Sequence, residues 1–239
     1  MDNSEFEPSQ HFIAYIDMLG YRAKIKEHGA AELARSISKK FEESEQIIKE
    51  NGDERKQIKW KAFSDNVLFC TEESCMPLIG LMAFFQIKMI QENLFVRGAL
   101  CHSQLYFDEK FICGDGIILA HEIESEIAIF PRIILHQSYI RAIDNFYEHK
   151  PTSYPQFKAG IYQEDVDGQK FLDYLELVFD FFLNENINEM KIILSNHAEQ
   201  IKNNLSRNTN ERTLQKYHWA KNYHNQFCKD HGFESFIIP

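Results

Sequence analysis

The sequence predicts an α+β protein with a ferredoxin-like, split βαβ core, an antiparallel-rich sheet with helices on one face, and a C-terminal helical extension. Two observations support this class. Segments typical of strands and helices follow the order strand, helix, strand, strand, helix, strand over residues 11–107. The chain then closes with two amphipathic segments, 188–205 and 212–227, whose apolar residues recur at helical spacing.

Local patterns define the individual core elements. Residues 11–19 form an apolar and aromatic run that ends before Gly20, as in a buried strand entering a turn. Residues 30–52 carry apolar side chains at helical spacing and end in Asn-Gly, so a helix stopped by Gly52 is expected. The other expected core elements are a strand hairpin (57–63 and 67–71), a packed helix (75–94), a second hairpin turning at 108–110 (95–116), a helix (116–128) and a strand (131–136).

The character of the sequence changes near residue 150. Residues 1–150 are expected to form the core. Residues 151–239 are expected to add a hairpin with Asp-Gly at its turn and the two C-terminal helices, packed on the core as one compact domain.

Composition and charge narrow the classes of partner. The chain has 239 residues, of which 44% are hydrophobic, enough for one well-buried core. Its 26 basic and 36 acidic residues give a net charge of −10, which opposes non-specific binding to nucleic acid or to an anionic membrane. An anionic substrate therefore needs local basic groups or metal ions.

Targeting and redox signals point to the cytoplasm. The segment MDNSEFEPSQ is acidic where a signal peptide is basic, and no apolar run reaches the roughly 20 residues that span a bilayer. The five cysteines include no CxxC pair, so neither a disulfide framework nor a zinc site is expected.

Two acidic residues stand out at the ends of predicted strands. Asp17 closes the first strand, and Asp65 lies in the Ser-Asp-Asn turn of the first hairpin. In a split βαβ sheet that strand and hairpin are neighbours, so the two carboxylates are expected to meet at one edge. Their mutual repulsion is relieved by divalent cations, and Mg²⁺ prefers one or two carboxylates together with phosphate oxygens. Taken alone, Asp65 is most simply explained as a solvated turn residue.

The segments around these two aspartates resemble motifs of a known family. FIAYIDMLGY and KAFSDNVLF are similar to the first and second metal motifs of class III nucleotidyl cyclases, and RGALCHSQLY with GDGIILAHEIE resembles their fourth strand and following helix. Gly114, Ala120 and Glu124 stand in the family's glycine, alanine and glutamate places. The resemblance covers residues 10–135 in order and implies a nucleotidyl cyclase fold for the core.

Within that family the chain looks closest to the bacterial pyrimidine cyclases of Pycsar anti-phage defence. The segments FSDN, RGAL, FPRIIL, EDVDGQKFLDYL and KYHWAKNYHN carry this likeness. It implies conversion of UTP, ahead of CTP, to the 3′,5′-cyclic mononucleotide and pyrophosphate. It also implies a homodimer with sites at the interface, and an effector reached only through the cyclic nucleotide.

The resemblance also implies roles for individual residues. Two Mg²⁺ or Mn²⁺ ions would be held by Asp17, Met18 and Asp65, and the nucleotide would be bound by Met18, Leu19, Gly20, Tyr21 and Lys61. The ions would lower the pKa of the attacking ribose 3′-hydroxyl and neutralise the triphosphate. Lys61 falls where purine cyclases carry a residue that reads the base; contact with the base and a plain strand position are both open.

Three positions depart from the family pattern. Ile118 and Glu122 stand where animal-type cyclases place a ribose-orienting Asn and a transition-state Arg, and Phe111 replaces an Asp that recognises purines. Another cation is then needed at the reacting phosphate. The catalytic candidate is Arg97, which opens a core strand beside Asp17 and Asp65 but could equally be an ion-pair partner. Arg22 and Arg132 follow it as candidates.

Other classes of function remain open from the sequence. Retention of both aspartates favours an enzyme, whereas the missing Asn and Arg favour a catalytically inactive module that binds nucleotide or regulates. A purine cyclase making cAMP or cGMP is a further alternative. A polymerase palm or diguanylate cyclase would show a GG[DE]-type turn, which FSDN is not. A structural protein without a site is the remaining alternative.

Overall fold

The computed structural model describes residues 7–50, 58–149, 160–183 and 187–239. The predicted helix stop at Gly52, the strand start at Gln57 and the division at residue 150 lie outside these ranges. The elements in chain order are β1 (Ser9–Leu19), α1 (Tyr21–His28), α2 (Ala30–Glu50), β2 (Lys59–Phe63), β3 (Asn66–Thr71), α3 (Cys75–Gln91), β4 (Phe95–Phe107), β5 (Ile112–Cys113), α4 (Asp115–Glu122), a π-helical turn (Ile123–Ile127), β6 (Ile133–Leu135), α5 (Gln137–His149), β7 (Tyr162–Glu164), β8 (Lys170–Leu172), α6 (Tyr174–Leu183), α7 (Ile187–Arg207) and α8 (Glu211–Asp230).

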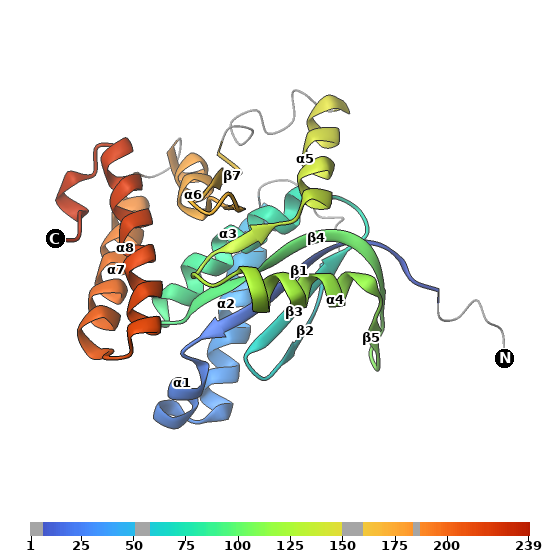
Figure 1. Cartoon of the computed structure of the whole chain (residues 1–239), viewed down its shortest axis with the longest axis horizontal. Coiled ribbons are helices and arrows are strands. Elements are labelled where there is room, and N and C mark those ends of the chain that lie inside the picture. Colours follow the sequence, from blue (N-terminus) through green and yellow to red (C-terminus); the bar gives the residue numbers. More distant parts are fainter. Residues whose placement is uncertain (1–6, 51–57, 150–159, 184–186) are drawn as a thin grey trace.

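One sheet organises the described residues, with strand order β2-β3-β1-β4-β6-β8-β7 and β5 paired to β4 (Figure 1). All of these pairings are antiparallel except that of β4 with β6. Strand β1 lies between β3 and β4, as a split βαβ core requires. The predicted antiparallel-rich α+β class and its C-terminal helices are confirmed.

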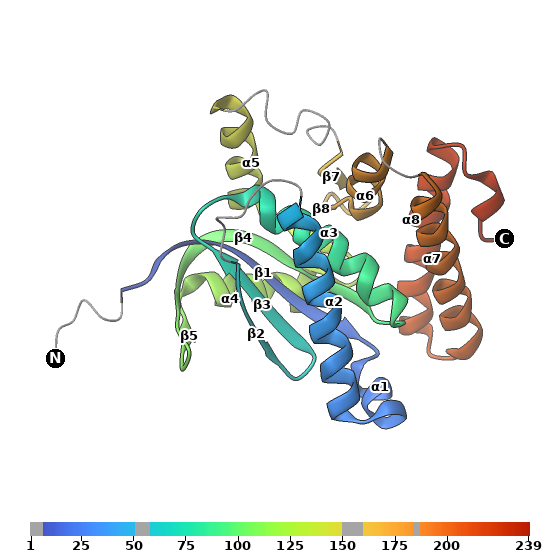
Figure 2. The same cartoon turned by 180° about the vertical axis from the view of Figure 1, so that it is seen from behind.

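The sequence led us to expect all the helices on one face of the sheet, but the structure has helices on both faces. α2 and α3 cover one face, and α4 crosses the other (Figures 1 and 2). The reason lies in β1, where Ile13 and Ala14 point to opposite faces and both are fully buried. A strand that is apolar on both faces needs cover on both. Close contact with α4 is possible because a side chain at Gly116 would collide with Ile13.

Helix α1 was missed by the sequence analysis, which expected only a turn after β1. None of its side chains is buried, so it lacks the apolar stripe that marks an amphipathic helix. It begins directly after Gly20, whose φ of 90° lies in the left-handed region that glycine adopts without strain. This sharp turn places the first amides of α1 beside the end of β1.

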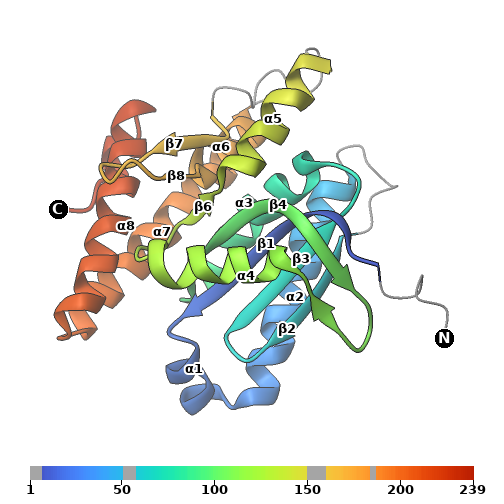
Figure 3. The ribbon, with the colours of Figure 1, turned by 45° about the vertical axis from the view of Figure 1, so that its right-hand side comes forward.

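The two long C-terminal helices pack against each other beside the core (Figure 3). Tyr217 of α8 meets Phe95 at the start of β4 edge-to-face, with ring centroids 5.3 Å apart. Asn204 of α7 donates a hydrogen bond to the side chain of Asn93, in the turn that joins α3 to β4. The extension is therefore held to the core at the end of the sheet where β4 begins and β1 ends.

A buried chain of hydrogen bonds joins the C-terminal helices. His197 of α7 lies 2.8 Å from the Tyr174 hydroxyl and 2.9 Å from Nδ1 of His224 on α8. The Nε2 of His224 lies 3.0 Å from the carbonyl of Phe236. One assignment satisfies every partner: Tyr174 donates to His197, His197 donates to His224, and His224 donates to the carbonyl, with both rings neutral. Burial accordingly lowers the pKa of His224 and lowers that of His197 well below its usual value.

We expect this histidine pair to make the fold sensitive to acid. Because both pKa values are lowered on folding, the unfolded chain binds more protons below about pH 6.5. The free energy of unfolding should then fall by up to about 1.4 kcal/mol per pH unit for each histidine, as measured by urea denaturation between pH 7.5 and 5.5.

A double variant checks the source of this dependence. His197→Leu/His224→Leu should lose most of the acid slope, whereas His218→Gln, at an exposed position of α8, should keep it. An unchanged slope in the double variant would show that other groups are responsible.

Candidate active site

The structure brings Asp17 and Asp65 together at one end of the sheet. Asp17 on β1 stands opposite Asn66, the first residue of β3, and the amide of Met18 donates to the carbonyl oxygen of Asp65 at 2.8 Å. Both carboxylates also act on the hydroxyl of Tyr15. Burial first, then the charges of Glu124, Asp17 and Asp65, raise the pKa of Tyr15 to about 12. The two aspartates therefore share one local electrostatic environment.

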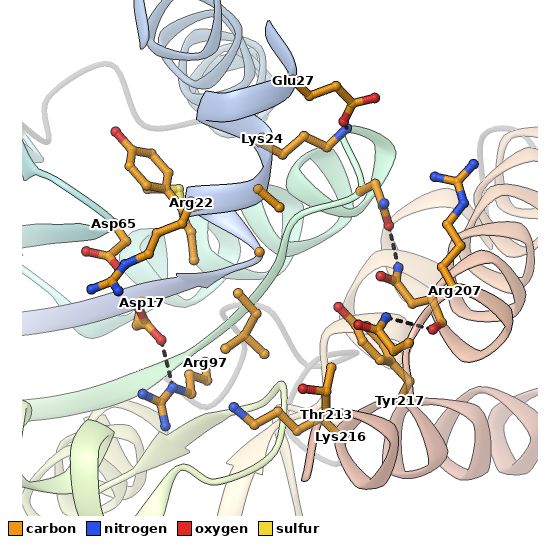
Figure 4. Close-up of a pocket in the computed structure, with 18 residues that line it drawn as sticks. Asp17, Arg22, Lys24, Glu27, Asp65, Arg97, Arg207, Thr213, Lys216 and Tyr217 are labelled. Carbon is orange, nitrogen blue, oxygen red and sulfur yellow. Dashed lines mark hydrogen bonds and ion pairs between the residues drawn. The ribbon is translucent and has the colours of Figure 1, made fainter. Parts of the chain in front are cut away.

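Both aspartates line a cavity of about 660 Å³ between the end of β1, helix α1 and the C-terminal helices (Figure 4). The predicted nucleotide-binding run Met18, Leu19, Gly20 and Tyr21 lines the same cavity. The amide of Met18 is already engaged by Asp65, but the first amides of α1 have no partner within their helix, as at any helix N-terminus. The run can thus present donors to an anion.

Arg97 of β4 is held between two carboxylates. Its Nε donates to Oδ2 of Asp17 at 2.8 Å, and its Nη2 lies 2.7 Å from Oε1 of Glu124, an ion pair outside hydrogen-bond geometry. The Glu124 side chain is only 5% exposed. Burial raises the pKa of Glu124, and the nearby Arg97 lowers it. The predicted catalytic arginine is therefore at the site, where it neutralises two acids.

Lys61, in contrast, is turned away from the cavity. Its ammonium donates to the carbonyl oxygens of Asp108 and Glu109 at 3.0 and 2.8 Å and lies over the ring of Phe107 at 5.5 Å from the centroid. These groups belong to the hairpin arm formed by β4 and β5. Within this chain Lys61 secures that arm and does not meet Asp17 or Asp65.

The carboxylate pair fits a divalent cation. Among the described residues no group of three or more His, Cys, Asp and Glu side chains is arranged to hold a metal ion. A magnesium site needs fewer, since one or two carboxylates suffice when phosphate oxygens complete the ligand set. The guanidinium of Arg97 already stands in as a cation on Asp17, which shows that this carboxylate takes up positive charge. Asp17 and Asp65 are the residues that would hold the metal.

Besides Arg97 and Arg22, which the sequence suggested for the site, the cavity contains three basic residues that it did not suggest. Its cationic lining residues are Arg22, Lys24, Arg97, Arg207 and Lys216, against the acidic Asp17, Glu27 and Asp65. Lys24 pairs with Glu27, their charged atoms 3.8 Å apart. In the described part of the chain Arg22, Arg207 and Lys216 form neither an ion pair nor a side-chain hydrogen bond. A chain with a net charge of −10 thus concentrates unpaired positive charge here.

Lys216 is the most enclosed of these unpaired cations. It comes from α8, and its side chain extends toward Arg97 and Asp17 (Figure 4). Burial and the charge of Arg97 lower the pKa of Lys216, while Asp17 and Glu124 raise it. Its segment was interpreted as an amphipathic helix and as part of the likeness to pyrimidine cyclases, but Lys216 itself was given no role, because no local pattern links it to β1.

The other sequence candidates lie elsewhere. Arg132 is fully buried and forms ion pairs with Asp165 and Asp167, so it anchors the hairpin of β7 and β8. Ile118 and Phe111 are each 58% exposed and do not line the cavity. They neither orient a ligand in this chain nor close the cavity.

Comparisons with known proteins give distant structural likenesses only. No protein-family model matches the sequence, and no curated protein does so significantly. Two solved structures of a bacterial light-regulated adenylyl cyclase match with 14% identity and a TM-score of 0.43, covering 59% and 58% of this chain and 48% and 46% of theirs. A class III adenylyl cyclase-like ATP-binding protein from Pseudomonas aeruginosa matches with 13% identity and a TM-score of 0.42, covering 76% of this chain and 43% of its own.

The chain spans about half the length of these solved chains. At such identities and TM-scores the likenesses say nothing of activity, so the proposals below rest on the residues of this chain. No helix in the described ranges combines the length and apolar character needed to cross a membrane.

Removal of Arg97 should destabilise the protein. Arg97→Met leaves Glu124 buried without a counter-charge, which should lower the free energy of unfolding by about 2–4 kcal/mol in urea denaturation at pH 7. The double variant Arg97→Met/Glu124→Met should recover most of this loss.

A matched control is Arg207→Met, which removes an exposed and unpaired arginine from the same cavity. Its effect should stay within about 0.5 kcal/mol. If Arg97→Met were as stable as the unmodified protein, the pairing with Glu124 would contribute nothing to the fold.

Proposed function

We propose that the protein is a metal-dependent nucleotidyl cyclase that converts a nucleoside triphosphate to its 3′,5′-cyclic mononucleotide and pyrophosphate. The observation that carries this proposal is the cavity, which combines a carboxylate pair with unpaired cations from three directions. Carboxylates at Asp17 and Asp65 suit Mg²⁺ or Mn²⁺, two ions per site, and unpaired arginine and lysine side chains suit a triphosphate. A ligand with both features is a metal-bound nucleoside triphosphate.

The residues present define what the chain does in such a reaction. The ribose 3′-oxygen attacks the α-phosphorus, the bond from that phosphorus to the bridging oxygen breaks, and pyrophosphate leaves while the hydroxyl proton passes to solvent. Asp17 and Asp65 would hold the metal, which when bound would lower the pKa of the attacking hydroxyl and offset phosphate charge. The turn from Met18 to Tyr21 with the first amides of α1 binds phosphate oxygens. Arg97 holds the carboxylate of Asp17 in place through their ion pair.

The base and the biological role are proposed from the sequence resemblance alone. The likeness to the pyrimidine cyclases of Pycsar defence favours UTP, then CTP, over purines. It also favours a second-messenger synthase acting in the cytoplasm against phage, with an effector that responds to the cyclic nucleotide.

A homodimer would complete the site. Lys61 faces away from the cavity of its own chain, so a base-reading role requires a second copy. Exposed apolar side chains on the side of the sheet that carries Asp17 support such an interface. Phe63 pairs across the strands with Asn66, itself opposite Asp17, and is 41% exposed, while Ile118 on α4 is 58% exposed.

A nucleotide-binding module without turnover is the second candidate. The ion pair between Arg97 and Asp17 favours it, because a metal must compete with the guanidinium for that carboxylate. The two candidates predict the same binding but differ in product, so an activity assay separates them.

We expect the purified protein with Mn²⁺ or Mg²⁺ to release pyrophosphate and a cyclic nucleotide from UTP or CTP. Asp65→Asn should lower kcat/KM by about 10³-fold, because loss of a metal ligand removes several kcal/mol of charge stabilisation. Asp144→Asn, at an exposed position of α5, is the matched control and should retain full activity.

The four common triphosphates should be assayed in parallel with binding. If all four triphosphates remain intact while the unmodified protein and Asp17→Ala bind nucleotide equally, the proposed catalysis is wrong. The proposed role of Asp17 in metal binding is then wrong as well. A cyclic purine as the sole product would replace the pyrimidine assignment and leave the cyclase assignment in place.

The dimer should depend on the apolar side chains near α4. Ile118→Lys places a charge on that surface, so it should shift the protein toward monomer in analytical ultracentrifugation and reduce activity in parallel. Ile192→Lys, at a 59% exposed position of α7, should leave the assembly unchanged. A monomer that makes product at full rate would exclude a shared site.

A further inference from the structure

We propose that Lys216, from the C-terminal extension, supplies the cation that contacts the reacting phosphate. This inference rests on the proposed function, since it assigns a residue to the same site. The sequence raised the question directly, because Glu122 stands where a transition-state arginine is expected and cannot stabilise developing negative charge.

The position of Lys216 in the cavity supports this role. The side chain of Lys216 lines the cavity that holds Asp17 and Asp65, and its ammonium is directed toward Asp17 and Arg97 (Figure 4). A phosphate held by metal at the two aspartates must lie at this end of the cavity. Lys216 is therefore the cation of α8 that faces the place where the reaction would occur.

Lys216 has no other visible role in the part of the chain that the structure describes. It is partly buried, and among the described residues its ammonium forms no ion pair and no hydrogen bond. An enclosed ammonium without a direct partner is costly, and the guanidinium of Arg97 adds repulsion that the charges of Asp17 and Glu124 offset in part. Such a group contributes little to the fold in this form. A bound phosphate would supply the missing partner.

Arg97, the nearest alternative cation, is largely engaged within the chain. Arg97 is engaged by Asp17, by Glu124 and by the carbonyl oxygen of Ala128, at 3.4 Å from Nη1. Each of its three nitrogens is already directed at one of these oxygens, which leaves only two of its five N–H groups for a phosphate. The ammonium of Lys216 instead has three N–H groups without a partner. It is therefore better placed than Arg97 to bind the negative charge that develops on the phosphate in the transition state.

The backbone that carries Lys216 is fixed to the core. A cation stabilises a transition state best when the protein fixes it beforehand. Tyr217, the next residue on α8, is buried against Phe95, and Asn204 on the adjacent helix α7 is bonded to Asn93. Helix α8 is thus tied to the core strand that also carries Arg97, so the backbone of Lys216 is held relative to Asp17.

The test compares Lys216→Gln with Lys216→Arg in the full-length protein. Inorganic tripolyphosphate is the binding probe, titrated calorimetrically without metal, and UTP or CTP turnover with Mn²⁺ is the second readout. Lys216→Gln should weaken tripolyphosphate binding by about tenfold and lower kcat by about 10²-fold, because one charged contact is lost. Lys216→Arg should restore most of both.

Two controls separate contact with phosphate from a structural role. Lys229→Gln removes an exposed lysine from the same helix, outside the cavity, and should behave as the unmodified protein. The midpoint of thermal unfolding of Lys216→Gln should not fall by several degrees, since Lys216 has no ion pair or hydrogen bond to lose among the described residues. A fall of several degrees would make Lys216 structural and overturn the inference.

The remaining outcomes distinguish this inference from the proposed function. Unchanged binding and turnover in Lys216→Gln would overturn the role of Lys216 and leave the cyclase intact. Lys216-dependent tripolyphosphate binding without any cyclic product would support phosphate contact while rejecting the cyclase. Failure of the unmodified protein to bind tripolyphosphate would overturn the inference.

Discussion

The site depends on one constraint, the pairing of β1 with β3 on one side and β4 on the other. This pairing places Asp17 opposite Asn66 in one neighbour and opposite Arg97 in the other. Residues facing each other across adjacent strands point to the same side of a sheet, so a carboxylate, a guanidinium and the turn that carries Asp65 come together. A shift of one residue in the register would turn Asp17 to the opposite face.

The buried apolar layers on both faces of β1 enforce this register. Ile13 and Ala14 are fully buried on opposite sides, so a one-residue slip would exchange the two buried rows, set Ala14 in the space that Ile13 fills and turn Asp17 toward the opposite layer. Helix α4 covers the face that carries Asp17, and the π-helical turn that follows brings Glu124 to Arg97. Packing and ion pairing therefore support the same arrangement, and the acidic site is held in place by a hydrophobic core.

The sequence alone was enough to predict those residues of the site that stand in recognisable short segments. Asp17 ends an apolar strand and Asp65 sits in a turn, and both positions can be read from short segments. It missed α1, which has no buried side chain, and it placed α4 on the wrong side because periodicity does not state which face a helix covers. It could not pair Arg97 with Glu124 or bring Lys216 to Asp17, since tertiary packing alone creates these contacts.

The positions in the sequence of the cations that line the cavity explain why the composition of the chain did not indicate a positively charged site. The cations that line it come from α1, β4, α7 and α8, and no two of the unpaired ones are close in sequence. A strongly acidic chain without a basic run therefore gains a locally positive cavity only when it folds. The surrounding negative charge repels polyanions that must spread over a wide surface, whereas a small anion can enter a cleft lined by cations. Net charge and local charge together therefore favour a small anion over nucleic acid.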